Sequence, residues 1–467
     1  MLTKGDVVMH PKYGLGTILR FRNRRFDAWV TFGRFRLWLR VRELQGMGKS
    51  IGLVGSNARS SASVSHNNQL MHSGVRLKKP SMSFSIKKDT QKMQILESLR
   101  TGLVPKSEIA DWTFGRDAEV QAVKNWLNDL SEGALLIEGG YGMGKSHLLA
   151  YLEHMAWKEN FAVAFTGYDP SEATAAFPKR FYRNLISTFS LWFDGRMLGF
   201  RDFIHELLEK GAIDFFKDQP YLYKFMKALQ DGSVDEADWE WLEGRDTYSK
   251  NYGFLYDHRT AANIYCNILS ALSAASVEFM GLQGLLILVD EAEVIRTQRY
   301  RYQVEGAMNL MRGLAMVSND DPVFLDETIA RNGSYRGTES GLLYSGFMPN
   351  MRYIYRIPTY LKIAYALTPS EIPGFHRMRA QMPVIKLSPL NRKDVKALFN
   401  QLVVTYKGVY DLSLDKKWQT NLFNRSVELF DPNYLPLRML VKALVEAMDI
   451  LRFYPTIRME EIFDSNT

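Results

Sequence analysis

A glycine-rich stretch about a third of the way along the chain has the residue types needed to hold a phosphate. Gly139-Gly-Tyr-Gly-Met-Gly-Lys-Ser146 fits the pattern G-x-x-x-x-G-K-[ST] at every fixed position. A short apolar run, residues 134–138, precedes it, and a segment with helical periodicity, residues 145–157, follows it. Glycines let backbone N–H groups converge on an anion, and the N-terminus of a helix adds a favourable dipole. The spacing therefore predicts a site for the phosphates of a nucleotide.

The side chains of this loop have separate expected roles. Lys145 is expected to reach the β- and γ-phosphates, and the Ser146 hydroxyl to bind Mg²⁺. A second G-K-S, at residues 48–50, is assigned to a linker, because Glu43 stands where the motif needs its first glycine. The residues expected to contact the nucleotide are Gly140, Tyr141, Gly142, Met143, Gly144, Lys145, Ser146, His147 and Arg116.

Two adjacent carboxylates follow a second apolar run. The run is Leu285-Leu-Ile-Leu-Val-Asp-Glu291, whose first five residues have the pattern of a buried strand. Ligands of open α/β sheets bind beyond the carboxyl ends of the strands. We therefore expect Asp290 to hold Mg²⁺, directly or through water, and Glu291 to activate water as the general base of ATP hydrolysis. The alternative is a strand that ends in two solvated acids.

Hydrolysis also needs polar and cationic groups around the developing charge. Thr368, at the end of the apolar run 362–367, is a candidate for contact with the γ-phosphate, although it fits a turn before Pro369 equally well. Arg438, at the start of a helical segment, is expected to reach back to the nucleotide, and Arg116 to frame it. Four other arginines are candidates for a finger across a subunit interface, with an ordinary surface charge as the alternative for each: Arg299, Arg301, Arg377 and Arg379.

The composition is that of a soluble globular chain with two or three domains. The 467 residues are 46% hydrophobic and 24% charged, and the net charge of +8 favours polyanionic partners. The single cysteine, Cys266, excludes an internal disulfide and fits a reducing cytoplasm. We expect no secretory signal and no membrane span, because the apolar runs are too short.

The chain divides into four expected segments. Residues 1–45 have short apolar runs between turn signals and predict a small basic β-barrel. Residues 46–88, rich in Ser, Asn, His and Gly, predict a flexible basic linker. Residues 89–388 alternate strands with helices, which predicts an α/β core with a parallel sheet and a helical insertion at about 195–260. Residues 389–467 predict a helical lid.

Individual elements of the core and lid follow from apolar periodicity. The expected core strands are residues 134–138, 161–165, 285–289, 362–367 and 384–387. The expected helices are residues 91–100, 118–130, 145–157, 177–193, 392–405, 415–429 and 436–451.

The order of these elements resembles the AAA+ and STAND-type P-loop ATPases. More closely, the chain is similar to the ATP-binding proteins of bacteriophage-exclusion (BREX) defence systems over about residues 90–455. The resemblance implies a P-loop ATPase with a role in bacterial antiviral defence. The stretches that carry it are Leu99–Pro105, Gly115–Glu119, Gly140–His147, Val289–Glu293 and Ile385–Leu390.

The N-terminal stretch has a resemblance of its own. Gly5-Asp-Val-Val-Met-His-Pro-Lys-Tyr-Gly-Leu-Gly-Thr17 is similar to the SH3- or Tudor-like module of CarD-type transcription factors and of some DNA repair helicases. In those proteins the module docks onto RNA polymerase or DNA. The resemblance implies recruitment of double-stranded DNA or of a partner protein.

Two functions agree with these patterns. The first is a cytoplasmic ATPase, with ATP and Mg²⁺ as cofactors, that acts on DNA or a DNA-associated complex together with defence-system proteins, as a homo-oligomer with ATP between subunits. The second is an adaptor that keeps the nucleotide as a structural ligand and docks partner proteins through the N-terminal barrel. Glu291→Gln separates them, because only the ATPase has turnover to lose.

Overall fold

The computed structural model of the protein separates into two compact units, Met1–Arg76 and Leu77–Thr467. In the first unit the structure describes the backbone of five strands between residues 6 and 49. In the second it describes side chains in residues 90–103, 105–106, 108–168, 176–298, 300–369, 375–376, 378–380, 382–410, 412–431 and 435–463.

The N-terminal unit contains an antiparallel sheet in the order β4-β3-β2-β1-β5. Its last strand pairs with β1, and the expected end of this unit at residue 45 is therefore wrong, because residues 45–49 continue the sheet. The second G-K-S thus begins inside a strand and not in a linker. Closure into a barrel stays a prediction, because the side chains that would fill it lie outside the described residues. The strands are β1 (Asp6–His10), β2 (Gly14–Arg22), β3 (Asp27–Phe32), β4 (Phe35–Arg40) and β5 (Gln45–Lys49).

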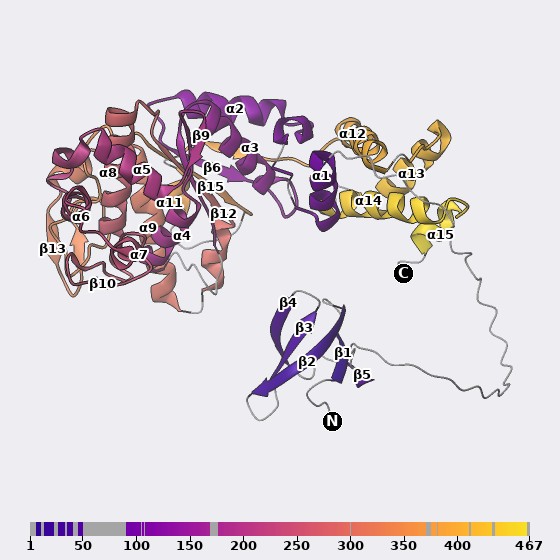
Figure 1. Ribbon diagram of the computed structural model, residues 1–467, viewed down its shortest axis with the longest axis horizontal. Helices are drawn as coiled ribbons and strands as arrows, with labels where there is room; N and C mark the ends of the chain where they lie inside the picture. The colour runs from indigo at the N-terminus through magenta and orange to yellow at the C-terminus, as the bar shows by residue number, and fades with distance from the viewer. Residues whose placement is uncertain are drawn as a thin grey trace. The chain divides into compact units, whose positions relative to one another are not determined.

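A parallel sheet forms the centre of the second unit, in the order β16-β6-β15-β12-β7 (Figure 1). Its three middle strands are buried along their whole length, as expected for a sheet covered on both faces. Parallel pairing places the carboxyl ends of β6, β15 and β12 at one edge, beside each other. The strands are β6 (Ala134–Glu138), β7 (Ala162–Gly167), β12 (Leu285–Asp290), β15 (Leu361–Leu367) and β16 (Val384–Lys386).

Alternate residues of these strands pack against different helices. Leu135 and Ile137 face a cluster with α2 (Asp117–Asn128) and α3 (Lys145–Lys158). Ala134 and Leu136 face a larger cluster that includes helices not predicted from the sequence. These are α8 (Ala262–Met280), which is buried on nearly every side, and α9 (Arg301–Ser318), and they join α4 (Pro178–Thr188).

The insertion after α4 is only partly helical. The helix expected over 177–193 ends at Thr188, and the chain then forms a hairpin of β8 and β9. Asp194 and Gly195 have φ angles of 48° and 76°, the conformation that a tight hairpin turn needs and that Asp-Gly favours. The apolar periodicity that predicted a helix continues through β8, but the Asp194-Gly195 turn makes this segment one strand of a hairpin. The elements are β8 (Leu191–Phe193), β9 (Arg196–Leu198), α5 (Phe200–Glu209), η4 (Ala212–Phe216), α6 (Pro220–Gln230), α7 (Glu236–Leu242), β10 (Tyr248–Ser249) and β11 (Gly253–Phe254).

Smaller elements precede the last two strands of the core. Between β12 and β15 lie η5 (Ala292–Thr297), α10 (Val323–Asp326) and a hairpin of β13 (Ile329–Arg331) and β14 (Tyr335–Gly337). Between β15 and β16 lies α11 (Phe375–Arg379).

The lid has a hydrophobic core separate from those of the sheet. Its expected helices are present, and it recruits an element from before the core, because α1 packs on α12 and α14 (Figure 1). Arg100 of α1 donates to both carboxylate oxygens of Asp449 in α14, at 2.9 and 3.0 Å. The lid elements are α1 (Thr90–Thr101), α12 (Arg392–Tyr410), α13 (Lys416–Leu429), α14 (Leu437–Phe453) and α15 (Met459–Asp464).

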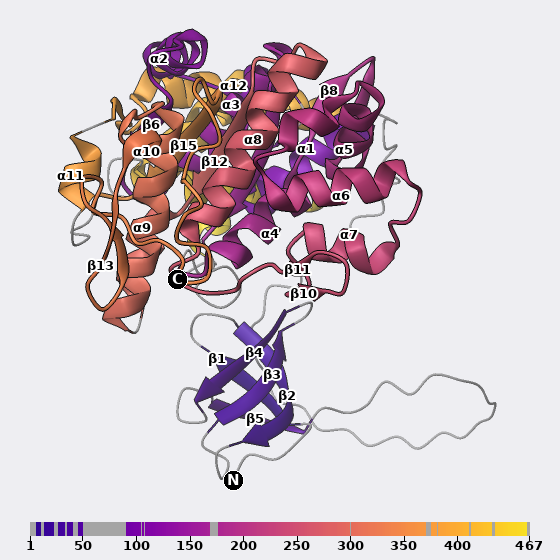
Figure 2. The ribbon, with the colours of Figure 1, turned by 90° about the vertical axis from the view of Figure 1, so that its left-hand side faces the viewer.

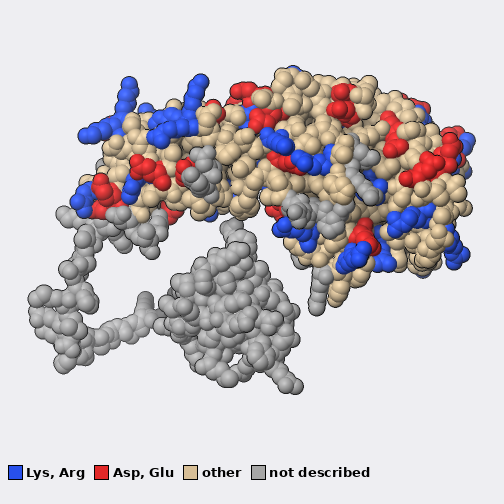
Figure 3. All heavy atoms as spheres, turned by 180° about the vertical axis from the view of Figure 1, so that it is seen from behind, with Lys and Arg blue, Asp and Glu red and all other residues tan. Residues whose placement is uncertain are grey.

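Charged groups of both signs are interspersed over the described surface of the core, and Lys and Arg side chains project from the lid end (Figure 3). Among the described residues, no helix is long and apolar enough to cross a membrane. Together, the parallel sheet, the phosphate loop after β6 and the helical lid confirm the expected fold class, an α/β P-loop NTPase of AAA+ type.

Candidate nucleotide site

The loop between β6 and α3 has the backbone shape that its glycines allow. Gly142 and Gly144 have φ angles of 76° and 91°, in the left-handed region that residues with a Cβ rarely adopt. Gly144 is also the residue from which α3 starts, so that the free N–H groups of the helix face the loop. Met143 folds back, and its sulfur accepts a hydrogen bond from Gly140 N at 3.1 Å. This is the concave backbone expected to receive phosphates.

Lys145 lies where β6 and β15 end side by side. Its side chain is almost fully buried, and its ammonium donates to the carbonyl oxygens of Gly139 at 2.9 Å and Gly140 at 3.2 Å. A third bond, of 3.0 Å, goes to the hydroxyl of Thr368. Burial lowers the pKa of Lys145, and the carboxylates of Glu293, Asp290 and Glu291 oppose that effect. The strand order thus brings Thr368 to the lysine of the loop although 223 positions separate them.

The acidic pair stands at the end of the neighbouring strand, β12. Asp290 is buried, and its Oδ1 accepts from the backbone N–H of Glu291 at 2.9 Å. Glu291 has a φ of 54° and leaves the strand sharply, so its side chain is exposed while that of Asp290 is not. Desolvation raises the pKa of Glu291, and the charges of Asp290 and Glu293 raise it further, against Arg438 and Lys145. A raised pKa suits a carboxylate that takes a proton from water.

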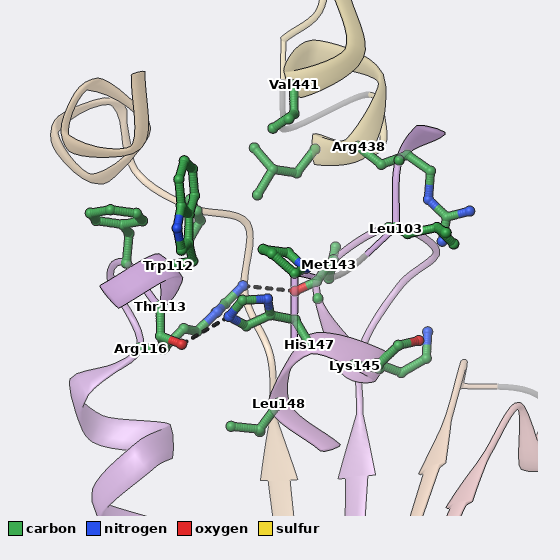
Figure 4. A pocket seen from close by; sticks show the side chains of 18 of the residues that line it. Leu103, Trp112, Thr113, Arg116, Met143, Lys145, His147, Leu148, Arg438 and Val441 are labelled. Carbon is green, nitrogen blue, oxygen red and sulfur yellow. Dashed lines mark hydrogen bonds between the residues drawn. The ribbon is translucent and has the colours of Figure 1, made fainter. Parts of the chain in front are cut away.

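Arg116 braces the loop. It lies at the start of α2, and its buried guanidinium donates to Met143 O at 2.8 Å and to Ser388 O at 2.7 Å. A third bond, of 2.9 Å, goes to Glu119, which balances its charge. The expected role of Arg116 in framing the nucleotide stays a prediction; the structure shows that Arg116 fixes the Met143 carbonyl of the loop (Figure 4).

A pocket with an empty volume of about 1220 Å³, part of it open to solvent, extends from the loop to the lid (Figure 4). One end is polar and contains Lys145, Ser146, Asp290 and Glu291. The other end is apolar and comes from segments far apart in the chain: Leu99, Leu103, Trp112, Phe114, Leu390, Leu398 and Val441. A polar end beside an apolar end of this size matches a nucleoside triphosphate, with phosphates at the first and a flat base at the second.

His147 lies on the wall between these two ends. Its Nε2 is 2.8 Å from the hydroxyl of Thr113, which ties α3 to the segment before the core (Figure 4). Burial, together with the charge of Arg116, lowers the pKa of His147 to about 4, so the imidazole is neutral at physiological pH. His147 lines the pocket, and its expected contact with the nucleotide stays a prediction.

The lid touches the phosphate loop directly. A Cβ on Gly142 would lie 2.3 Å from Cβ of Pro436, the residue that precedes α14. Two residues on, Arg438 lines the pocket, and its guanidinium lies 5.6 Å from the centre of the Tyr141 ring. The predicted reach of Arg438 back to the nucleotide stays a prediction, and in this structure its charge acts on both Lys145 and Glu291.

The comparison with protein families agrees with this geometry. Residues 86–209 match the family described as BREX system ATP-binding protein BrxC/D. This segment is similar to the BREX ATP-binding proteins. The BREX match includes α1, the Leu99–Pro105 stretch, Arg116 and the whole phosphate loop. It therefore contains all the residues before β7 that line the pocket. No curated protein matches the chain.

Solved structures share only a distant similarity with the chain. AMPPCP-bound DnaA from Aquifex aeolicus has 13% identity and a TM-score of 0.27, over 74% of this chain and 73% of that one. The HORMA:CdnC:Trip13 complex of E. coli MS115-1 gives 11% and 0.28, over 69% and 76%. At such scores the fold assignment depends on the strand order and the loop described above, and the BREX assignment on the family match.

Glu293 is a site residue that sequence reasoning did not single out. It lines the pocket, and its Oε2 is buried without a hydrogen-bond partner among the described residues. It also heads the acids that act on the charge of Lys145. The signal was its place: Glu293 is the second residue of the 3₁₀-helix η5, which begins two residues after Asp290, the last residue of β12.

The candidate finger arginines have different outcomes. Arg379 is paired within its own chain: its guanidinium forms a 2.7 Å ion pair with Glu138 at the end of β6. Arg301 is 93% exposed and pairs loosely with Glu305 at 3.5 Å. Arg299 and the side chain of Arg377 lie outside the described residues.

Proposed function

We propose that this chain binds ATP with Mg²⁺ between its core and its lid and hydrolyses the ATP, releasing the γ-phosphate. This cycle of binding and hydrolysis serves bacterial anti-phage defence in the cytoplasm. One observation carries the proposal most. Lys145, Thr368 and the carboxylates of Asp290 and Glu291 converge at the carboxyl edge of one parallel sheet, in front of the glycine loop. Phosphoryl transfer depends on positioning and on charge stabilisation, and these are the groups that it uses.

Each side chain has a role in the proposed reaction. Lys145 moves its hydrogen bonds from the loop carbonyls to the β- and γ-phosphate oxygens, and Thr368 contacts the γ-phosphate. Glu291 accepts a proton from the attacking water. Ser146 and Asp290 hold Mg²⁺, which supplies positive charge to the phosphate oxygens. Arg438 brings a second cation from the lid, so that hydrolysis depends on how the lid is placed.

Glu291→Gln tests the hydrolytic role. The amide cannot accept the proton, and loss of a general base typically costs about 10²–10⁴ in rate. We expect phosphate release to fall at least 100-fold while affinity for ATP, measured by calorimetry, changes less than threefold. Glu278→Gln is the matched control, because Glu278 lies near the C-terminus of α8, at the amino edge of the sheet, and pairs there with Arg356. Unchanged phosphate release in Glu291→Gln removes Glu291 from this role.

DNA is the second part of the proposal. In the N-terminal segment, Lys and Arg far outnumber Asp and Glu, and the resemblance of residues 5–17 is to a module that docks onto polymerase or DNA. If this unit holds duplex DNA through phosphates, the logarithm of affinity falls with the logarithm of salt concentration, by about 0.9 per contact. An interaction that salt does not weaken supports docking of a protein and favours the adaptor function in its place.

The assembly belongs to the proposal as well. Arg301 is free enough to reach a neighbouring copy, so a homo-oligomer with ATP near its interface is the expected active form. Mass measurement with and without ATP, beside ATPase assays with and without duplex DNA, tests it. A chain that binds ATP but shows no turnover with DNA and partners present favours the adaptor.

A further inference from the structure

Four aromatic side chains form a row on the surface, three from the insertion and one, Phe347, from the loop before β15. The rings of Tyr248 and Phe254 lie 4.8 Å apart across the β10–β11 hairpin. Phe254 and Tyr256 are stacked at 6.0 Å, and Tyr256 and Phe347 are stacked at 4.6 Å with an interplanar angle of 5°. Tyr248, Phe254 and Phe347 are 54%, 53% and 60% exposed. Large apolar side chains rarely stand together in solvent without a partner to cover them.

The row is held rigidly from below. Buried Asn263 donates to the carbonyl oxygens of Met348 at 3.0 Å and Met351 at 2.8 Å, and it accepts from Ser345 N at 3.0 Å. These bonds fix the loop that carries Phe347. On the other side, Tyr265 donates to Tyr256 O at 2.8 Å. A surface whose rings are held in place before binding loses little entropy when a flat ligand stacks on them.

A basic pocket adjoins the row. It is lined by Lys179, Arg180, Arg183 and Arg245, with Asp257 as its one carboxylate. Arg245 pairs at 3.2 Å with Glu243, whereas Arg183 has no hydrogen-bond or ion-pair partner among the described residues. Lys179 is 4% exposed, and burial lowers its pKa against the opposing charges of Asp257 and Asp246. The pocket therefore has an excess of positive charge.

Direct bonds join the pocket to the row. Lys179 Nζ donates at 2.7 Å to the hydroxyl of Thr247, the residue before Tyr248. Arg180 lies 3.5 Å from the carboxylate of Asp257, the residue after Tyr256. Tyr182 of α4 also donates to Leu242 O at the end of α7, at 3.0 Å. The helix that carries the cations and the hairpin that carries the rings are thus one surface, and α4, α7, β10 and β11 lie on the same side of the core (Figure 2).

We propose that this surface binds single-stranded DNA, with successive bases stacked on Tyr248, Phe254 and Phe347 and with backbone phosphate in the pocket of Lys179, Arg180 and Arg183. Sequence-independent binding of single strands combines aromatic rings on which bases stack with a basic groove for the backbone. Duplex DNA fits less well, because its bases already stack on each other. The site rests on the proposed function for its choice of DNA, and it names the form of DNA that the core contacts.

The test uses the full chain and a fluorescein-labelled oligo(dT) of 20 nucleotides, followed by anisotropy. We expect it to bind, and a 20-base-pair duplex measured beside it reports the duplex binding proposed for the N-terminal unit. Phe254→Ala removes one stacking ring and should weaken oligo(dT) binding by about tenfold, within the range measured for single aromatic residues. Phe453→Ala, at the C-terminal end of α14 in the lid and similarly exposed, is the control and should change affinity less than twofold.

The pocket is tested separately. Arg183→Ala should weaken oligo(dT) binding and lower the salt slope by about one phosphate contact, whereas Arg458→Ala, a 76% exposed arginine of the lid, should leave both unchanged. Ultraviolet crosslinks of a 5-iodouracil oligonucleotide should map to residues 248–256 and 347.

Several results would overturn the site. These are a loss of duplex affinity in Phe254→Ala as large as its loss of oligo(dT) affinity, tighter binding of oligo(rU) than of oligo(dT), crosslinks confined to residues 1–76, or oligo(dT) bound as tightly by Phe254→Ala as by the parent. ATP hydrolysis without DNA should be unchanged in Phe254→Ala, because the row contributes nothing to the nucleotide pocket. The DNA site and the ATPase can therefore fail independently: lost oligonucleotide binding with intact turnover removes only the site, and Glu291→Gln without effect removes only the reaction. Thermal unfolding of each variant confirms that it is folded.

Discussion

Three carboxylates face one lysine across the phosphate loop, and their mutual repulsion sets the ionisation of the site. The pKa of Glu291 is raised by desolvation and by the charges of Asp290 and Glu293. The pKa of Lys145 is lowered by burial and supported by the same acids, with Glu293 first among them. Glu293 thus acts on both groups, and it does so without a hydrogen bond from a described residue.

Glu293→Gln should move the pH profile of kcat/KM to lower pH at both limbs. Without that charge the pKa of Glu291 falls, so the base stays deprotonated to lower pH and the acid limb shifts down. The pKa of Lys145 also falls, because it loses a supporting carboxylate, so the alkaline limb shifts down as well. The profile of kcat/KM reports the free enzyme, in which these groups face each other. The same substitution at exposed Glu278 should leave both limbs in place, and an unmoved acid limb in Glu293→Gln contradicts the assigned coupling.

The polar residues of the site were predictable, because each lies in a local motif or directly after a buried strand. Lys145, Ser146 and Asp290 belong to patterns of a few residues, and Thr368 follows the run 362–367. The apolar end of the pocket was not predictable as a site. Leu103, Trp112 and Val441 lie in three different segments, and only the lid's contact with the core brings them together.

The contact of the loop with α14 depends on one glycine. Gly142 has a φ of 76°, and the space where its Cβ would lie is taken by Pro436. Gly142→Ala therefore strains the loop and pushes the lid away, which displaces Arg438 from the pocket. We expect affinity for ATP to fall at least tenfold, about 1.4 kcal/mol, as measured by calorimetry.

Gly195→Ala is the matched control for this substitution. Gly195 has the same φ of 76° but nothing within 4 Å of its missing Cβ. Both alanines pay the cost of a left-handed conformation, roughly 1–2 kcal/mol, so both should unfold earlier in urea. Only Gly142→Ala should lose ATP affinity. Equal loss in the two variants would mean that strain, and not the lid, controls the site.

Strands with strong flanking signals were predicted well, and helices whose periodicity runs on were not. β6 and α3 begin at the expected residues because a glycine loop separates them. The helix expected to reach residue 193 stops at Thr188, since the chain on either side of the Asp194-Gly195 turn pairs into a hairpin. α8 was not predicted because it is buried on nearly every side and so lacks the polar face that a periodicity argument needs.

The second unit contains separate hydrophobic clusters, two around the sheet and one in the lid. The lid begins earlier in the chain than its expected start at 389, because α1 contributes Ile95, Leu96 and Leu99 to its hydrophobic core. Sequence order alone could not reveal this, since a helix before the sheet reads like any other core helix. Lid residues that line the nucleotide pocket therefore come both from before the core in the chain, such as Leu99, and from after it, such as Leu398 and Val441.

Because the pocket is lined by residues of both the sheet core and the lid, a bound nucleotide should link the unfolding of these two parts of the second unit. A ligand that binds only the folded state stabilises it by RT ln(1 + [L]/Kd), about 2.7 kcal/mol at one hundred times Kd. The pocket needs both the phosphate loop and the lid, so this stabilisation is lost when either the sheet core or the lid unfolds. We expect calorimetric scans of the free protein to show the lid unfolding before the sheet, as a separate cluster can.

With Mg-ADP, the two transitions should merge into one at higher temperature. Lys145→Ala, which removes the phosphate contact but none of the lid contacts, should keep them apart at every ADP concentration. If the free protein already unfolds in one transition, or if ADP raises the sheet transition alone, then the lid does not hold the nucleotide. In that case Arg438 would have no access to the phosphates, and hydrolysis would depend on the core and a neighbouring copy.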